Sequence, residues 1–188
     1  MKFDFDLQKS IAATAYLAER SARKSTVLFL IKMLYAADRD ALLNWHRTIT
    51  GDSPFSMENG PVLSCIYNLM NGKGLKAHRL EWEKVFEDRQ ENLIKVRSGV
   101  DLNSLLDALS DREIASLDAA RVKVSGVKEK IADWAHKEFP EWENPKSSSK
   151  PIDFEKVLSV SGHSANEIEG IVAEVTAIQS AKRALKAA

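Results

Sequence analysis

The side chains that could carry out chemistry are few and widely spaced. The four histidines, His46, His78, His136 and His163, are all too far apart for the i+3 to i+5 spacing of metal ligands on one helix. Cys65 is the single cysteine, so the chain can form neither an intramolecular disulfide nor a zinc site with several cysteines. As a nucleophile, Cys65 would need a histidine from a distant part of the chain. The sequence therefore predicts no catalytic residue, no metal and no cofactor.

Two further patterns imitate functional motifs without matching them. The stretch Asn71-Gly72-Lys73-Gly74 lacks the first glycine and the hydroxyl residue of a phosphate-binding loop, and a helix end explains it better. Asp38 and Asp40 are two residues apart, so on a helix they point in different directions and cannot share a substrate. Neither pattern indicates phosphate transfer or acid–base catalysis.

Asp38 is nevertheless informative, because it falls on the apolar stripe formed by Val27, Ile31, Leu34 and Ala41 of one predicted helix. An ionised carboxylate on such a face must receive hydrogen bonds, since an unpaired buried charge is costly. The nearest source of donors is the turn-rich segment 48–60. Asp38 either pins this segment to the helix or contacts a ligand or partner, and the sequence leaves both readings open.

Hydrophobic periodicity and capping residues predict the elements that position these side chains. Ser110 and Glu113 form an S-x-x-E capping box, and Ser164 and Glu167 form another. Pro61 suits the first position of a helix. We expect Gly60 before it to adopt a backbone conformation that a Cβ would strain. The pattern predicts about seven helices, over residues 6–20, 25–43, 61–71, 110–125, 127–137 and 153–160 and from residue 164 onward.

A smaller β component is expected in the middle of the chain. The segment 82–97 has apolar runs on both sides of the polar turn 88–92, which is typical of a hairpin, and a piece of 44–58 can supply another strand. The predicted fold class is therefore mainly α with a small antiparallel β-sheet (α+β). We expect a compact single domain with a β-hairpin or a three-stranded sheet.

Composition excludes several classes of function. The 188 residues include 27 Lys+Arg and 27 Asp+Glu, and this zero net charge argues against a dedicated nucleic-acid binder. The most apolar stretch, 27–35, contains Lys32 and is far shorter than the roughly 20 residues that span a membrane. The N-terminus carries Asp4 and Asp6 where a signal peptide needs an apolar run. With a single cysteine, these features indicate a cytoplasmic protein.

Three ordered motifs resemble the Panacea domain, also called the SocA-like antitoxin or phage-associated protein family. They are I-K-M-L-Y-A-A-D-R-D at 31–40, T-I-T-G-D at 48–52 and N-G-P-V at 59–62. Thr48 replaces the usual proline and Met33 the usual leucine. A weaker likeness includes His136 and Trp142 and extends to about residue 155. The motif residues for which the resemblance implies a structural role are Tyr35, Asp38, Thr50, Gly51, Asp52, Gly60 and Pro61.

The resemblance implies an antitoxin that neutralises a cognate toxin by direct protein–protein binding, without catalytic residues. The alternative within the family is a proteolytic adaptor that delivers a bound client to a protease, and an enzyme is the third reading. The expected partners are thus a toxin protein and, for an adaptor, a protease, with no membrane and no nucleic acid. We expect the Panacea-like domain at 1–160 and a C-terminal helix at 161–188 packed on it.

Two tryptophans are candidates for contacting the partner. Protein interfaces favour exposed aromatic side chains, and a few of them anchor the complex. Trp45 and Trp142 lie in segments predicted to be turn or loop, whereas Trp134 lies on an apolar helical stripe and is expected in the core. The alternative is that both cover the core from outside.

Overall fold

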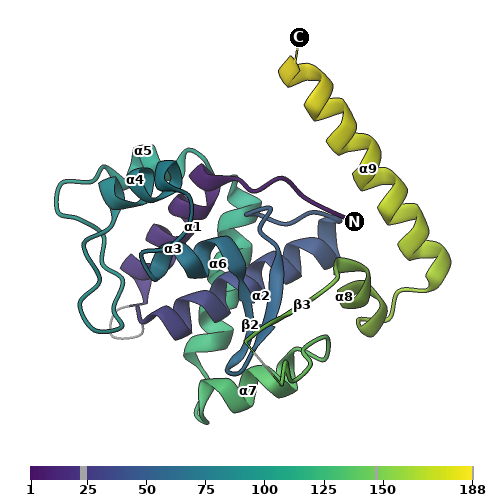
Figure 1. The fold of residues 1–188 in the computed structure, drawn as a ribbon, viewed down its shortest axis with the longest axis horizontal. Coiled ribbons are helices and arrows are strands. Elements are labelled where there is room, and N and C mark those ends of the chain that lie inside the picture. Colours follow the sequence, from purple (N-terminus) through teal and green to yellow (C-terminus); the bar gives the residue numbers. More distant parts are fainter. Residues whose placement is uncertain (22–24, 147, 188) are drawn as a thin grey trace.

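A long central helix organises the fold of the computed structural model, which describes residues 1–21, 25–146 and 148–187. This helix, α2 (Val27–Trp45), packs against α1 (Leu7–Arg20) and α6 (Asp111–Ser125), as Figure 1 shows. The helix expected from residue 6 is capped by Asp6, whose side chain accepts a hydrogen bond from the backbone N–H of Lys9 at the start of α1. Ser110 and Glu113 form the predicted capping box of α6.

A small antiparallel sheet lies beside α2. Its strands are β1 (Pro54–Met57), β2 (Gly60–Leu63) and β3 (Lys150–Pro151), in the order β2-β1-β3. β1 pairs with β2 in the register Ser56↔Pro61 and with β3 in the register Ser56↔Lys150. The predicted fold class, mainly α with a small three-stranded antiparallel sheet, is confirmed.

The prediction of a β-hairpin at 82–97 is wrong. Residues Lys76–Val85 form helix α4, and the rest of the segment makes isolated bridges instead of paired strands: Phe86↔Val96, Gln90↔Leu93 and, to the residue before α2, Thr26↔Leu93. The reason is that Trp82, Val85 and Phe86 repeat at i, i+3 and i+4, which is helical spacing. The Trp82 and Phe86 rings stack with centroids 4.1 Å apart, and this contact closes the end of α4.

The helix predicted to begin at Pro61 is also misplaced. Pro61 lies in β2, and the helix, α3 (Ser64–Met70), begins three residues later. Pro61 is tolerated because β2 is an edge strand, where a missing N–H need not break the ladder. Gly60 precedes it at a φ of +95°, the left-handed region expected from the sequence.

The remaining helices are α5 (Leu102–Leu106), α7 (Ile131–Glu138), α8 (Phe154–Val160) and α9 (Ala165–Ala187). The described residues thus form nine helices rather than about seven, because α4 and α5 were not predicted as helices. Asp153 precedes α8 as expected, but its side chain makes no capping hydrogen bond.

The C-terminal helix α9 is covered along only part of its length. Ile171 and Val175 are buried in a small cluster with residues of α8, such as Leu158. Further along the same helix, Ile178 and Leu185 are 46% and 80% exposed. The predicted apolar side of α9 therefore extends past its contact with α8, and Figure 1 shows the helix projecting away from the other elements. None of the helices within the described ranges is long and apolar enough to cross a membrane.

Candidate functional site

Helix α2 carries a stripe of buried polar side chains, Lys32, Tyr35, Asp38 and Arg39, along its length. They recur at intervals of about one turn, so they share one side of the helix. Lys32, Tyr35 and Asp38 are 0%, 2% and 3% exposed. Lys32, Asp38 and the pair Tyr35 and Arg39 bind three segments that come later in the chain, so this polar stripe holds those segments in place.

Asp38 binds the turn at 48–52. Its carboxylate accepts hydrogen bonds from the backbone N–H groups of Ile49 at 2.9 Å and Thr50 at 3.1 Å, and from the Thr50 hydroxyl. Burial raises the pKa of Asp38 to about 7, and these hydrogen bonds act in the opposite direction. The sequence left two roles open for Asp38: fixing the turn to α2, or contacting a ligand or partner. These hydrogen bonds are the contacts that the first role requires.

Two replacements of Asp38 distinguish the loss of its hydrogen-bond acceptors, in Asp38→Ala, from the loss of its charge alone, in Asp38→Asn. We expect Asp38→Ala to lower the free energy of unfolding by about 1–3 kcal/mol, because two buried N–H groups and a hydroxyl lose their acceptor. Asp38→Asn should cost less, since its amide oxygen still accepts. Denaturant unfolding of the three proteins measures the difference. Equal losses for both variants would contradict this role.

The same turn also sets the start of α3. The buried carboxylate of Asp52 accepts from the backbone N–H groups of Cys65 at 3.0 Å and Ile66 at 2.9 Å. It thereby caps helix α3 from a distant part of the sequence. Burial raises the pKa of Asp52 above its usual range. Gly51, which directly precedes Asp52, has a φ of +67°. A Cβ at this position would collide with the carbonyl oxygen of Asp4.

Tyr35 and Arg39 hold the segment after α7 through Glu141. The Tyr35 hydroxyl donates to Glu141 Oε1 at 2.5 Å, and the Arg39 guanidinium donates to both carboxylate oxygens, at 2.8 and 3.3 Å. Arg39 also donates to the Ser161 hydroxyl at 2.8 Å, which ties in the end of α8. Burial, with the nearby Glu141 charge, raises the pKa of Tyr35 well above its usual value.

Lys32 holds the edge strand β2. Its Nζ donates to the carbonyl oxygen of Pro61 at 2.6 Å. The amine lies under Gly60, where a Cβ would come within 3.2 Å of Nζ and 2.9 Å of the Ala135 side chain. Gly60 is therefore required both for its backbone conformation and for the close approach of α2 and α7. Burial lowers the pKa of Lys32 to about 7.

The two tryptophans proposed as partner contacts are both half-buried. Trp142 donates its indole N–H to the Met57 carbonyl at 2.9 Å and stacks on His136, with centroids 3.7 Å apart. Trp45 is the last residue of α2 rather than part of the following turn, and the Arg112 guanidinium lies 5.4 Å from its ring centroid. Trp45 also lines a surface hollow of about 540 Å³ together with Arg47. The two rings belong to different parts of the surface.

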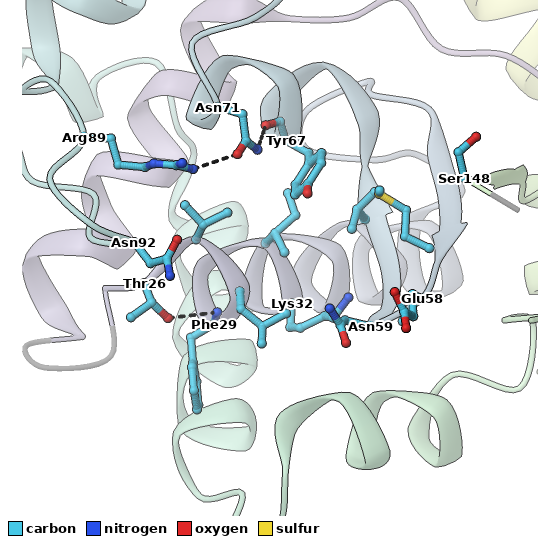
Figure 2. A pocket seen from close by; sticks show the side chains of 16 residues that line it. Thr26, Phe29, Lys32, Glu58, Asn59, Tyr67, Asn71, Arg89, Asn92 and Ser148 are labelled. Carbon is cyan, nitrogen blue, oxygen red and sulfur yellow. Dashed lines mark hydrogen bonds between the residues drawn. The ribbon is translucent and has the colours of Figure 1, made fainter. Parts of the chain in front are cut away.

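A larger cavity, of about 630 Å³, opens beside the first half of α2, and we call it the α2–α3 cleft. Figure 2 shows its walls, which come from α2, the β1–β2 turn, α3, the segment after α4 and Ser148. Asn71 links two of these walls, because its side chain accepts from Arg89 at 2.7 Å and donates to the Tyr67 carbonyl at 2.6 Å. The cleft is lined by Thr26, Val27, Leu28, Phe29, Ile31, Lys32, Met57, Glu58, Asn59, Gly60, Val62, Tyr67, Asn71, Arg89, Asn92 and Ser148.

The histidines and the cysteine considered as catalytic or metal-binding groups are not among the residues that line this cleft. Cys65 is half-buried, and burial raises the pKa of its thiol to about 11, which opposes a nucleophilic role at neutral pH. In the part of the chain that the structure describes, no three His, Cys, Asp or Glu side chains lie together as metal ligands. The arrangement is suited to binding another molecule.

These features define a small α+β protein whose inward-facing polar side chains on α2 hold a β-hairpin and one wall of an open cleft in place. Comparison with protein families identifies it further: the family described as "Antitoxin SocA-like, Panacea domain" matches residues 30–143. The chain belongs to this family. No curated protein and no solved structure matches the chain.

Several residues of the site were not singled out from the sequence. Glu141 was treated only as part of a loose loop, although it lies next to Trp142 in the weaker motif. Lys32 was read as an interruption of an apolar run, whereas a lone lysine at the centre of such a run also indicates a buried amine with a specific acceptor. Arg89 and the asparagines of the cleft belong to segments whose fold was predicted incorrectly or not at all.

Proposed function

We propose that this protein is the antitoxin of a toxin–antitoxin system and that it neutralises its toxin by direct binding. Membership of the SocA-like antitoxin family carries this proposal. An open cleft of about 630 Å³ and the partly accessible rings of Trp45 and Trp142 supply surfaces for a protein partner. We propose the cytoplasm as the place of action, where the lone Cys65 stays a thiol.

We propose that Trp45 or Trp142 contacts the toxin. Each has part of its ring accessible, and each is fixed by a neighbour, Arg112 or His136, so little rotamer freedom is lost on binding. The proposed organisation is a Panacea-like domain over 1–160 with the C-terminal helix of 161–188 packed on it. The contact of Ile171 with α8 supports this packing.

The proposal is tested with the product of the gene next to the one that encodes this chain. We expect its expression alone to stop the growth of a bacterial host, and co-expression of this protein to restore growth. The two proteins should then elute together as one complex in size-exclusion chromatography, in which the toxin can be recovered but is inactive. Continued growth arrest, or separate elution, would contradict direct neutralisation.

The same experiment distinguishes the proteolytic adaptor. If growth is restored because the toxin disappears, and if inactivation of a host protease makes the toxin reappear, then the protein delivers its client for degradation. A stable toxin at constant level in both hosts supports direct neutralisation instead. The measurement is the toxin level after protein synthesis is stopped, with and without the protease.

A further inference from the structure

One cation of the α2–α3 cleft, the exposed Arg89, has no carboxylate partner within the described residues, whereas Lys32 is fully buried and its pKa is lowered to about 7. Nζ of Lys32 has one hydrogen-bond acceptor, the Pro61 carbonyl, and Arg89 has one, the Asn71 side chain. The single acid among the lining residues is Glu58, which is exposed. Elsewhere in the described chain Glu141 and Glu113 show how a buried carboxylate is paired, with Arg39 and Lys9 respectively. Arg89 is thus the group of this cleft that can pair with a carboxylate of a bound partner.

The remaining lining groups are those that bind a peptide segment well. Leu28, Val62 and Met57 supply apolar surface, and Leu28 and Met57 are only half-buried. The amides of Asn59 and Asn92 can each donate and accept, as the backbone of a bound peptide requires. The volume of about 630 Å³ lies inside the range of specific ligand pockets, about 300–1,000 Å³.

We propose that the α2–α3 cleft binds an acidic segment of the toxin whose neighbouring residues are apolar. In this complex a carboxylate of the toxin pairs with Arg89 at the rim, and an apolar side chain packs against Leu28 on the wall. Charge complementarity at the rim favours an acidic occupant over a basic one, because a basic segment would meet the guanidinium of Arg89, which has no carboxylate partner within the described residues. This inference rests on the proposed function and assigns a location to its interface.

Charge reversal at the rim tests the proposal. Arg89→Glu should weaken binding of the purified toxin by about 10-fold or more and should reduce the dependence of affinity on salt, since a carboxylate would now face a carboxylate. The matched control is Lys95→Glu, an exposed lysine of the same segment that does not line the cleft. It should bind like the wild type. Isothermal titration calorimetry at low and high salt measures both effects.

A second variant tests the apolar wall. Leu28→Asp places a charge in the wall, while an acid in the first turn of α2 is compatible with the helix dipole, so the fold should survive. We expect a loss of binding at least as large as that of Arg89→Glu, and because Leu28 also packs partly on the hydrophobic core, binding is compared at a temperature at which a thermal melt shows the variant folded. A toxin variant in which one acidic residue is replaced by arginine should restore binding to Arg89→Glu.

The possible failures are distinguishable. If the wild type does not bind the toxin, the proposed function fails and this inference fails with it. If the wild type binds and both Arg89→Glu and Leu28→Asp bind equally well, the interface lies elsewhere and only this inference is overturned. If the chain alone forms a dimer that Arg89→Glu dissociates, the occupant is a second copy of the chain, which also overturns it.

Discussion

Glu141→Ala is expected to lower the free energy of unfolding by about 3–5 kcal/mol, the cost of breaking a buried ion pair by removal of one partner. The Glu141 side chain is fully buried and that of Arg39 is only 18% exposed, so water cannot readily replace the lost carboxylate. The Tyr35 hydroxyl, also buried, would lose its acceptor at the same time. Denaturant unfolding monitored by tryptophan fluorescence measures the loss.

A matched control lies two residues away. Glu143 pairs with Lys150 and Lys156 at the exposed surface, where water screens ion pairs, so Glu143→Ala should leave the stability almost unchanged. Glu141→Gln should fall between the two, because its amide oxygen still accepts from Tyr35 while the charge opposite Arg39 is lost. Similar values for Glu141→Ala and Glu143→Ala would show that the network at Glu141 does not stabilise the fold.

Local features of this fold could be predicted from the sequence. Asp6 and Ser110 begin their helices as expected, because a cap depends only on residues within one turn. The position of Asp38 on an apolar stripe required nearby donors, and the turn at 48–52 provides them. The left-handed backbone of Gly60 was likewise expected, since a glycine before proline at the end of a polar turn is typical of a strained position.

Features that depend on distant segments could not be predicted. Nothing near Glu141 in the sequence indicates that its partners are Tyr35 and Arg39, about a hundred residues earlier. The start of α3 was placed at Pro61 because the distant cap by Asp52 has no local pattern. The cleft combines five segments, and one of them, after α4, was assigned to a strand that does not form.

These contacts show what the polar residues of the motif at 31–40 do in the fold. Lys32 holds β2, Tyr35 holds Glu141 and Asp38 holds the 48–52 turn, so one side of a single helix fixes three segments that are far apart in sequence. Displacing any of these segments would leave buried polar groups on α2 without their hydrogen-bond partners. Because an unpaired buried polar group costs free energy, such a displacement would lower the stability of the fold. This arrangement keeps β2 and the β1–β2 turn, which form one wall of the α2–α3 cleft, in a fixed position.

Lys32 should make the stability of the protein rise with pH above neutrality. Burial lowers its pKa to about 7 in the folded state, from 10.5 for an exposed lysine. Between these two values the unfolded chain carries a proton on Lys32 that the folded chain lacks, so raising the pH favours folding. The free energy of unfolding should increase by on the order of 1 kcal/mol per pH unit from about pH 7 to 9. Urea unfolding over this range measures the slope.

Lys32→Met isolates this effect, because methionine fills the same space and does not titrate. The difference in stability between wild type and Lys32→Met should change with pH in the wild type's favour, whereas Lys95→Met, at an exposed lysine, should run parallel to the wild type. Asp38 contributes in the opposite sense: its folded pKa of about 7 lies above its ordinary 3.8, so its contribution declines as the pH rises from about 4 to 7. That contribution is common to all three proteins and cancels in the differences. Parallel curves for wild type and Lys32→Met would show that the amine titrates normally and that its burial against Pro61 does not suppress its charge.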